Sequence, residues 1–99
     1  MECYQLLKLL ERAGNIKITA VQTQTQITPE ITHRTDFLVF DLRLGEPVWV
    51  EYKGFQTERW RIIKKLWKSH GPGLLRIYSG YGLKMHCEEI RPKCGNAKL

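Results

Sequence analysis

The chain has 99 residues, of which 16 are Lys or Arg and 10 are Asp or Glu, so its formal net charge is +6 at pH 7. A chain of this length has room for one hydrophobic core, which excludes an architecture of two independent domains. No apolar run approaches the roughly 18 residues of a membrane-spanning helix, and no basic and apolar signal region opens the chain, so we expect a cytoplasmic protein without a membrane partner.

The first half of the chain predicts one helix and three strands. Residues 2–13 carry Leu6, Leu7 and Leu10 at helical spacing before Gly14 ends the pattern. Residues 16–27 are rich in Ile, Thr and Gln, which is typical of a strand with one wet face. Residues 33–44 and 48–53 predict two further strands, joined by a turn at residues 45–47 into a hairpin.

The second half predicts a helix and at least one more strand. Thr57 is a suitable cap for a helix that runs to about residue 69, with Trp60, Ile63 and Trp67 on one face. Residues 74–78 predict a short apolar strand, residues 83–90 a possible further strand, and residues 91–99 a loosely ordered tail. A crossover helix between two strands of one sheet makes those strands parallel.

The predicted fold class is therefore α/β, with one domain spanning residues 1–99. Its elements follow the order helix, three-strand antiparallel meander, helix and parallel strand, around a mixed central sheet. The core covers about residues 2–78, and residues 79–99 form a C-terminal extension.

Three cysteines, Cys3, Cys87 and Cys94, are an odd number at wide spacings and do not indicate a disulfide framework. His86 next to Cys87 makes a zinc site conceivable, but the CxxC pair of common zinc sites is missing. We favour free thiols.

The charge is unevenly distributed along the chain. Residues 1–52 hold five basic and seven acidic residues, a balance of −2, and residues 53–99 hold eleven basic and three acidic residues, a balance of +8. A basic half of this kind indicates a polyanionic partner such as nucleic acid, because Lys and Arg that neutralise phosphates release condensed counterions. Simple solubility is the alternative explanation.

Three charged residues interrupt otherwise apolar strands. Asp36 lies near the start of the second predicted strand, and Glu51 and Lys53 lie at the end of the third, on one face because side chains alternate along a strand. Antiparallel pairing brings all three to one end of the hairpin. Two carboxylates there suit a hard divalent cation, and a lysine beside them suits a role in orienting water or offsetting phosphate charge. The alternative is a set of solvated or ion-paired side chains.

An Asp on one strand and a Glu-x-Lys on the next, after a helix and before a helix and strand, resemble the PD-(D/E)XK nuclease superfamily. Over residues 2–78 the chain is most similar to small phage-type members related to Holliday-junction resolvases, although Thr35 stands where the motif has Pro. The resemblance implies a restriction-endonuclease-like core. It also implies that Asp36 and Glu51 ligate Mg²⁺ or Mn²⁺ with the backbone carbonyl of Tyr52, and that Lys53 positions the attacking water.

The resemblance implies further site residues. Glu2 falls where relatives carry a helical glutamate that supports the metal, with Glu11 as the alternative. One of Gln22, Gln24 and Gln26 corresponds to a polar residue on the first strand. Basic residues near the motif are the expected DNA-binding set, although an exposed helix face commonly carries such residues; they are Arg34, Arg59, Arg61, Lys64, Lys65 and Lys68.

The leading hypothesis is a metal-dependent endodeoxyribonuclease that hydrolyses phosphodiester bonds by in-line attack of an activated water. The resemblance implies 5′-phosphate and 3′-hydroxyl ends. So small a domain has little surface for reading bases, so we expect selectivity for branched DNA such as a Holliday junction, by a homodimer. Flap, nick or nonspecific cleavage stays open. The rival hypothesis is a non-catalytic nucleic-acid-binding module in which Asp36, Glu51 and Lys53 form only an ion-paired cluster.

Overall fold

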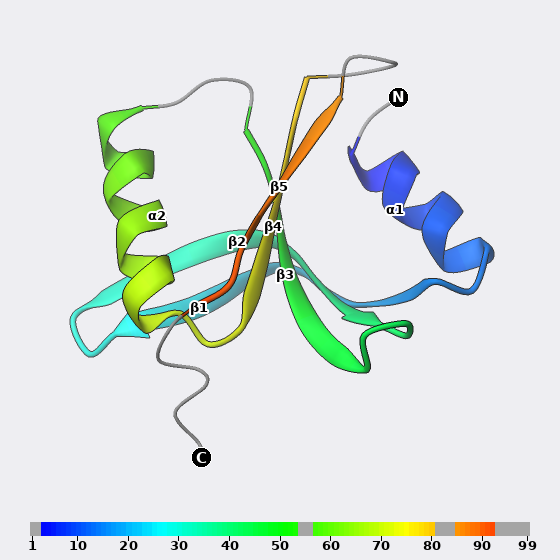
Figure 1. Ribbon diagram of the computed structural model, residues 1–99, viewed down its shortest axis with the longest axis horizontal. Helices are drawn as coiled ribbons and strands as arrows, with labels where there is room; N and C mark the ends of the chain where they lie inside the picture. Colours follow the sequence, from blue (N-terminus) through cyan, green and yellow to red (C-terminus); the bar gives the residue numbers. More distant parts are fainter. Residues whose placement is uncertain (1–2, 54–56, 81–84, 93–99) are drawn as a thin grey trace.

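The computed structural model describes residues 3–53, 57–80 and 85–92, and it is an α/β fold in which two helices pack on a five-stranded sheet. Figure 1 shows α1 and α2 on either side of the strands. The elements are α1 (Cys3–Arg12), β1 (Ile16–Thr28), β2 (Ile31–Asp41), β3 (Glu46–Tyr52), α2 (Glu58–His70), β4 (Leu74–Ser79) and β5 (His86–Ile90).

The sheet is mixed, and its strand order follows the chain. β1, β2 and β3 form an antiparallel meander, β3 and β4 are parallel, and β5 returns antiparallel to β4. The parallel pair is the one joined by α2, as expected for a crossover connection. The antiparallel meander and the parallel strand are thereby confirmed, and residues 86–90 of the predicted extension add a fifth strand at the sheet edge.

Side-chain alternation along the central strands gives the sheet two apolar faces. In β3, Val48 and Val50 are buried on the face that α1 covers, and Trp49 packs on the face that α2 covers. We call the first cluster the α1-side core; its buried members are Leu7, Ile16, Phe37, Val39, Val48, Val50, Leu74 and Tyr78. The second is the α2-side core; its buried members are Ile27, Trp60, Ile63, Trp67, Leu75 and Ile77.

The long β1–β2 hairpin contributes to both cores because β2 changes face part of the way along. Ile31 packs against the α2-side core, whereas Phe37, an even number of residues later and therefore expected on the same face, belongs to the α1-side core. Gln22 of β1, which lies across from this stretch of β2, is the only non-glycine among the described residues with a positive φ, 56°. The pairing register of the two strands also shifts between Ile18 and Ala20 and between Gln26 and Thr28, and Figure 1 shows the hairpin bending toward α2.

Several element ends differ from their predicted positions for local reasons. β2 begins at Ile31 rather than residue 33, and it ends at Asp41 rather than residue 44. It ends early because the Asp41 carboxylate accepts hydrogen bonds from the backbone N–H groups of Arg43 and Leu44, which closes a turn. The Thr57 cap is confirmed: its hydroxyl oxygen accepts a hydrogen bond from the Trp60 N–H.

None of the helices in the described segments combines the length and apolar character needed to cross a membrane.

Candidate active site

Asp36, Glu51 and Lys53 meet on the α2 face of the sheet. Phe37 and Val50 are paired across β2 and β3, so the next residues outward, Asp36 and Glu51, lie side by side. Both point away from the α1-side core that their neighbours Phe37 and Val50 enter, and Lys53 follows Glu51 on the same face. Because β2 starts at Ile31, Asp36 lies within this strand rather than at its start.

The Asp36 carboxylate is half-buried and hydrogen-bonded to the next strand. Its Oδ2 accepts a hydrogen bond from the Tyr52 N–H at 2.9 Å. Burial raises the pKa of Asp36, the hydrogen bond from Tyr52 opposes that rise, and the nearby charge of Glu51 adds to it. A carboxylate placed where ionisation is disfavoured is a common feature of functional sites.

Glu51 is the most deeply buried member of the cluster, with only 3% of its surface exposed. Its Oε2 lies 3.5 Å from the Lys53 Nζ. Its Oε1 lies 3.2 Å from Nε2 of His33 and accepts a long hydrogen bond, 3.4 Å, from the Asp36 N–H. A buried carboxylate requires such partners, because an unpaired charge in the interior is very unfavourable.

Trp60, in the first turn of α2, packs against the cluster on the side of the helix. The Lys53 Nζ lies 4.8 Å from the centroid of the Trp60 ring, within the range of a cation–π contact. The His33 ring packs against the same indole, with centroids 5.5 Å apart. The indole and imidazole rings thereby restrict the positions that the lysine and Glu51 side chains adopt.

The sequence places His33 beside the expected site without a role in it, since a lone histidine is more often on the surface than catalytic. Simple alternation puts it on the face of Thr35 and Phe37, away from Asp36. The bent β1–β2 hairpin carries it to the other face, where it meets Glu51 and Trp60. No pattern within β2 itself signals this change, because the left-handed residue that accompanies it lies in β1.

The structure gives positions for only some of the glutamate and glutamine residues that the resemblance assigns to the site. Glu2 lies outside the described residues. Glu11 binds the Lys8 ammonium and the Ile18 N–H, where α1 leads into β1. Gln22 lies across from Asp36, since its neighbours Val21 and Thr23 pair with Phe37 and Thr35.

Within the described residues no group of three or more His, Cys, Asp and Glu side chains is arranged to hold a metal ion. Two carboxylates alone, those of Asp36 and Glu51, suffice for Mg²⁺, which commonly takes one or two carboxylates and completes its octahedron with water and phosphate oxygens. The conceivable zinc site has no support: Cys87 is a free, exposed thiol, and Cys94 lies outside the described residues.

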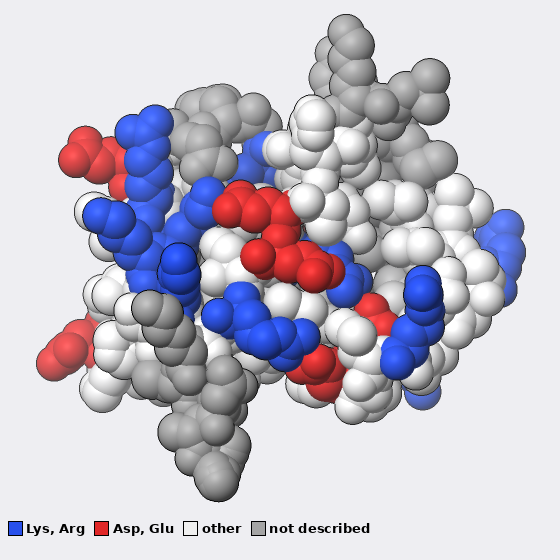
Figure 2. Space-filling view, in the orientation of Figure 1, with Lys and Arg blue, Asp and Glu red and all other residues white. Residues whose placement is uncertain are grey.

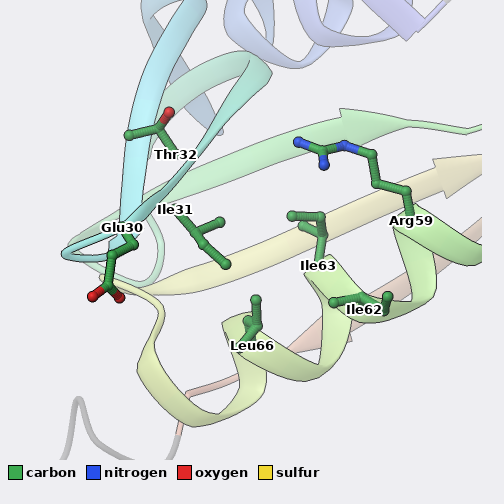
Figure 3. A pocket seen from close by; sticks show the side chains of 7 residues that line it. All are labelled: Glu30, Ile31, Thr32, Arg59, Ile62, Ile63 and Leu66. Carbon is green, nitrogen blue, oxygen red and sulfur yellow. The ribbon is translucent and has the colours of Figure 1, made fainter.

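The six predicted DNA-binding residues separate into three places. Arg34 is exposed on β2, across from Gln24. Arg59 lines a pocket of about 550 Å³ between α2 and the β1–β2 turn, and Figure 3 shows it at one end of a row of apolar side chains, with Glu30 at the other. The remaining four, together with Arg91, line a groove between α2 and β5; they are Arg61, Lys64, Lys65 and Lys68.

Comparison of the chain with protein-family models, with curated proteins and with solved structures finds no match, so the residues and their geometry alone carry the functional argument.

Proposed function

We propose that this protein is a metal-dependent endodeoxyribonuclease with its active site at Asp36, Glu51 and Lys53. The observation that carries the proposal is that Asp36 and Glu51 lie side by side on adjacent strands. The Lys53 ammonium lies 3.5 Å from the Glu51 carboxylate and 4.8 Å from the centroid of the Trp60 ring. Two like charges at this position oppose each other, and burial raises the pKa of Asp36. A cation held between them offsets both effects.

The arrangement of the elements supports this proposal. The resemblance to PD-(D/E)XK nucleases implies a helix, an antiparallel meander, a crossover helix and a parallel strand, and the sheet order β1-β2-β3-β4 is compatible with that plan. We propose that the α/β sheet is a restriction-endonuclease-like core, with β5 added at its edge.

Each residue of the cluster has a defined role in the proposal. Asp36 and Glu51, with the backbone carbonyl of Tyr52, hold Mg²⁺ or Mn²⁺. A bound divalent cation lowers the pKa of water and neutralises phosphate charge. Lys53, restrained by Trp60 and Glu51, orients the attacking water or stabilises charge on the phosphate in the transition state. His33 positions Glu51 through its Nε2.

For the substrate we propose branched DNA such as a Holliday junction, cut by a homodimer that presents two sites. Flap, nick and nonspecific duplex cleavage are the competing substrates within the same chemistry. A C₂ dimer places two identical sites about one axis, which suits the pseudo-symmetric strands of a four-way junction.

The test is cleavage of end-labelled DNA as a linear duplex, a nicked duplex, a flap and a four-way junction. Each substrate is incubated with Mg²⁺, Mn²⁺ or EDTA, and the wild type is compared with Asp36→Asn and Lys53→Met. We expect metal-dependent cleavage by the wild type and a loss of at least 100-fold in each variant, about the effect of removing a group that acts on the transition state.

Asp41→Asn is the matched control, because Asp41 is a buried aspartate on the same strand that lies outside the cluster. Its ion pair is with Arg76, 3.3 Å away. Cleavage that persists in Asp36→Asn and Lys53→Met, or that falls equally in Asp41→Asn while all three variants stay folded by circular dichroism, would overturn the site.

A specific observation favours the rival hypothesis of a binding module. Both oxygens of Glu51 already have partners within the protein, in Lys53, His33 and the Asp36 N–H. A purely structural cluster predicts that Lys53→Met lowers the melting temperature and that no DNA is cut under any condition. DNA binding retained in both variants would then identify the module.

A further inference from the structure

A groove between α2 and β5 collects basic side chains on the same face of the sheet as the proposed active site. Its volume is about 470 Å³. Figure 2 shows Lys and Arg side chains gathered over α2, beside a band of acidic side chains over β5. The groove is lined by Arg61, Lys64, Lys65, Lys68, Glu88, Glu89, Ile90 and Arg91.

The acidic residues of the groove already have cationic partners. Glu88 lies 3.2 Å from the Lys64 ammonium. Glu89 lies 2.8 Å from the Arg76 guanidinium, on the next strand. Their negative charge is therefore offset within the protein and opposes an incoming anion only weakly.

Three cations of the groove lack such a partner among the described residues. Arg91 is held by Glu46 at 3.1 Å, but no described carboxylate forms an ion pair with Arg61, Lys65 or Lys68. These three residues are exposed and recur at intervals of four and three, so they lie along one face of α2. They give the groove an uncompensated positive charge.

The spacing of the three cations suits a nucleic-acid backbone. At 1.5 Å per residue, Arg61 and Lys68 are about 10 Å apart along the helix axis. One strand of a DNA duplex carries a phosphate about every 3.4 Å of its axis, so this length corresponds to about three consecutive phosphates. A row of cations over three phosphates grips the backbone without reading bases.

We propose that this groove binds the phosphate backbone of a DNA duplex arm, away from the bond that is cut. The inference rests on the proposed function, since it names how the substrate of that site is held. Arg61, Lys65 and Lys68 contact the phosphates, and Lys64 and Arg91 are positioned by Glu88 and Glu46 at the groove walls. A grip on a duplex arm beyond the cleavage site gives a small protein selectivity for DNA shape.

The experiment measures binding of a fluorescein-labelled 20-base-pair duplex by anisotropy, in EDTA, over a series of KCl concentrations. The test variant is Arg61→Gln/Lys65→Gln/Lys68→Gln. Each neutralised phosphate contributes about 0.9 to the slope of log K against log salt, so we expect the slope to become shallower by about 2.7.

The matched control removes three exposed cations outside the groove, with the variant Arg12→Gln/Lys17→Gln/Arg43→Gln. We expect its slope to stay within about 0.5 of the wild type, because screening leaves only a weak effect of distant charges. Equal slopes for the two triple variants, or no binding of duplex by the wild type, would overturn the groove assignment. Displacement of the duplex by polyglutamate of equal charge and concentration would also overturn it, since it would indicate an acidic protein as the partner.

This design distinguishes a failure of the groove proposal from a failure of the active-site proposal. Binding in EDTA is independent of catalysis, so a wild type that binds with the expected slope yet cuts no DNA refutes the nuclease and retains the groove. Conversely, metal-dependent cleavage together with an unchanged slope in the groove variant retains the nuclease and refutes the groove.

Discussion

The substitution Gly71→Ala tests how the α2–β4 connection positions the parallel strand on which the site depends. Gly71 is buried, and a Cβ atom there would lie 2.5 Å from Cδ1 and 2.6 Å from Nε1 of Trp67. Trp67 has no exposed surface, and its indole N–H donates a 2.8 Å hydrogen bond to the Gly73 carbonyl. The added methyl group must therefore displace the indole from this hydrogen bond.

The expected loss of stability follows from these contacts. Overpacking a core costs about 1–3 kcal/mol, and a lost hydrogen bond about 0.5–1.5 kcal/mol. We therefore expect Gly71→Ala to lower the free energy of unfolding by about 2–4 kcal/mol, a large part of the roughly 5–15 kcal/mol of a typical domain. Backbone strain is not involved, because Gly71 has φ −62°.

Urea denaturation followed by far-ultraviolet circular dichroism measures this loss. The control is Gly45→Ala, where no atom lies within 4 Å of the added Cβ and the cost of about 1–2 kcal/mol comes from φ 72° instead. Near-ultraviolet circular dichroism separates the two mechanisms, since Trp67 packs edge-on against Trp49 with ring centroids 5.8 Å apart. A Gly71→Ala variant within 0.5 kcal/mol of the wild type, or with an unchanged near-ultraviolet spectrum, would refute the reasoning.

Three further predictions concern single side chains, each measured by thermal or urea unfolding. Because φ is positive at Gln22, Gln22→Gly should change the free energy of unfolding by less than about 0.5 kcal/mol, whereas Gln22→Val should lower it by about 1–2 kcal/mol. This order is the reverse of the usual strand preference, and a Val variant more stable than the Gly variant would contradict it. Burial raises the pKa of Asp36 in the folded protein above its ordinary 3.8, so Asp36 favours the folded state below about pH 4 and ceases to do so as the pH rises through the folded pKa. In EDTA, Asp36→Asn should therefore be more stable than the wild type at pH 7, and the difference should disappear in acid. Burial opposes ionisation of Asp41, but hydrogen bonds from Leu44, Arg43 and Arg76 lower its pKa, so Asp41 stabilises the fold above about pH 4 and ceases to do so as the pH falls through the folded pKa. Asp41→Asn should therefore lower the free energy of unfolding by about 1–3 kcal/mol at pH 7 and by less at pH 3. A difference that does not depend on pH would disprove this prediction.

Much of the fold could be predicted because local signals and packing agree. The Leu spacing of α1, the Thr57 cap and the Trp60, Ile63 and Trp67 face of α2 each specify one element, and the structure confirms them. The position of Asp36 beside Glu51, on the face that Lys53 shares, could also be predicted, because alternation and hairpin pairing determine it once the two strands are recognised.

The other features of the fold and the site depend on backbone geometry and tertiary position, which the pattern of residues does not predict. A left-handed residue at Gln22 follows no propensity rule, since Gly or Asn is the usual choice. Alternation along β2 puts His33 on the opposite face, so its contact with Glu51 could not be predicted. The six basic residues were expected to act as one set. They separate because α2 lies between the β1–β2 hairpin and β5, which places Arg59 on one flank and Arg61 on the other.

The change of face in the β1–β2 hairpin also bears on the order in which the chain folds. Most of the α1-side core comes from residues 7–50, and its strands pair between neighbours in sequence, so it closes through short loops. The α2-side core joins Ile27 at the hairpin tip to Trp60, Trp67 and Ile77, across separations of more than 30 residues. We expect it to form after the meander, so mutations there should mainly accelerate unfolding rather than slow folding. Because Glu51, Lys53 and Trp60 lie at that same interface, we expect the proposed active site to be completed late in folding.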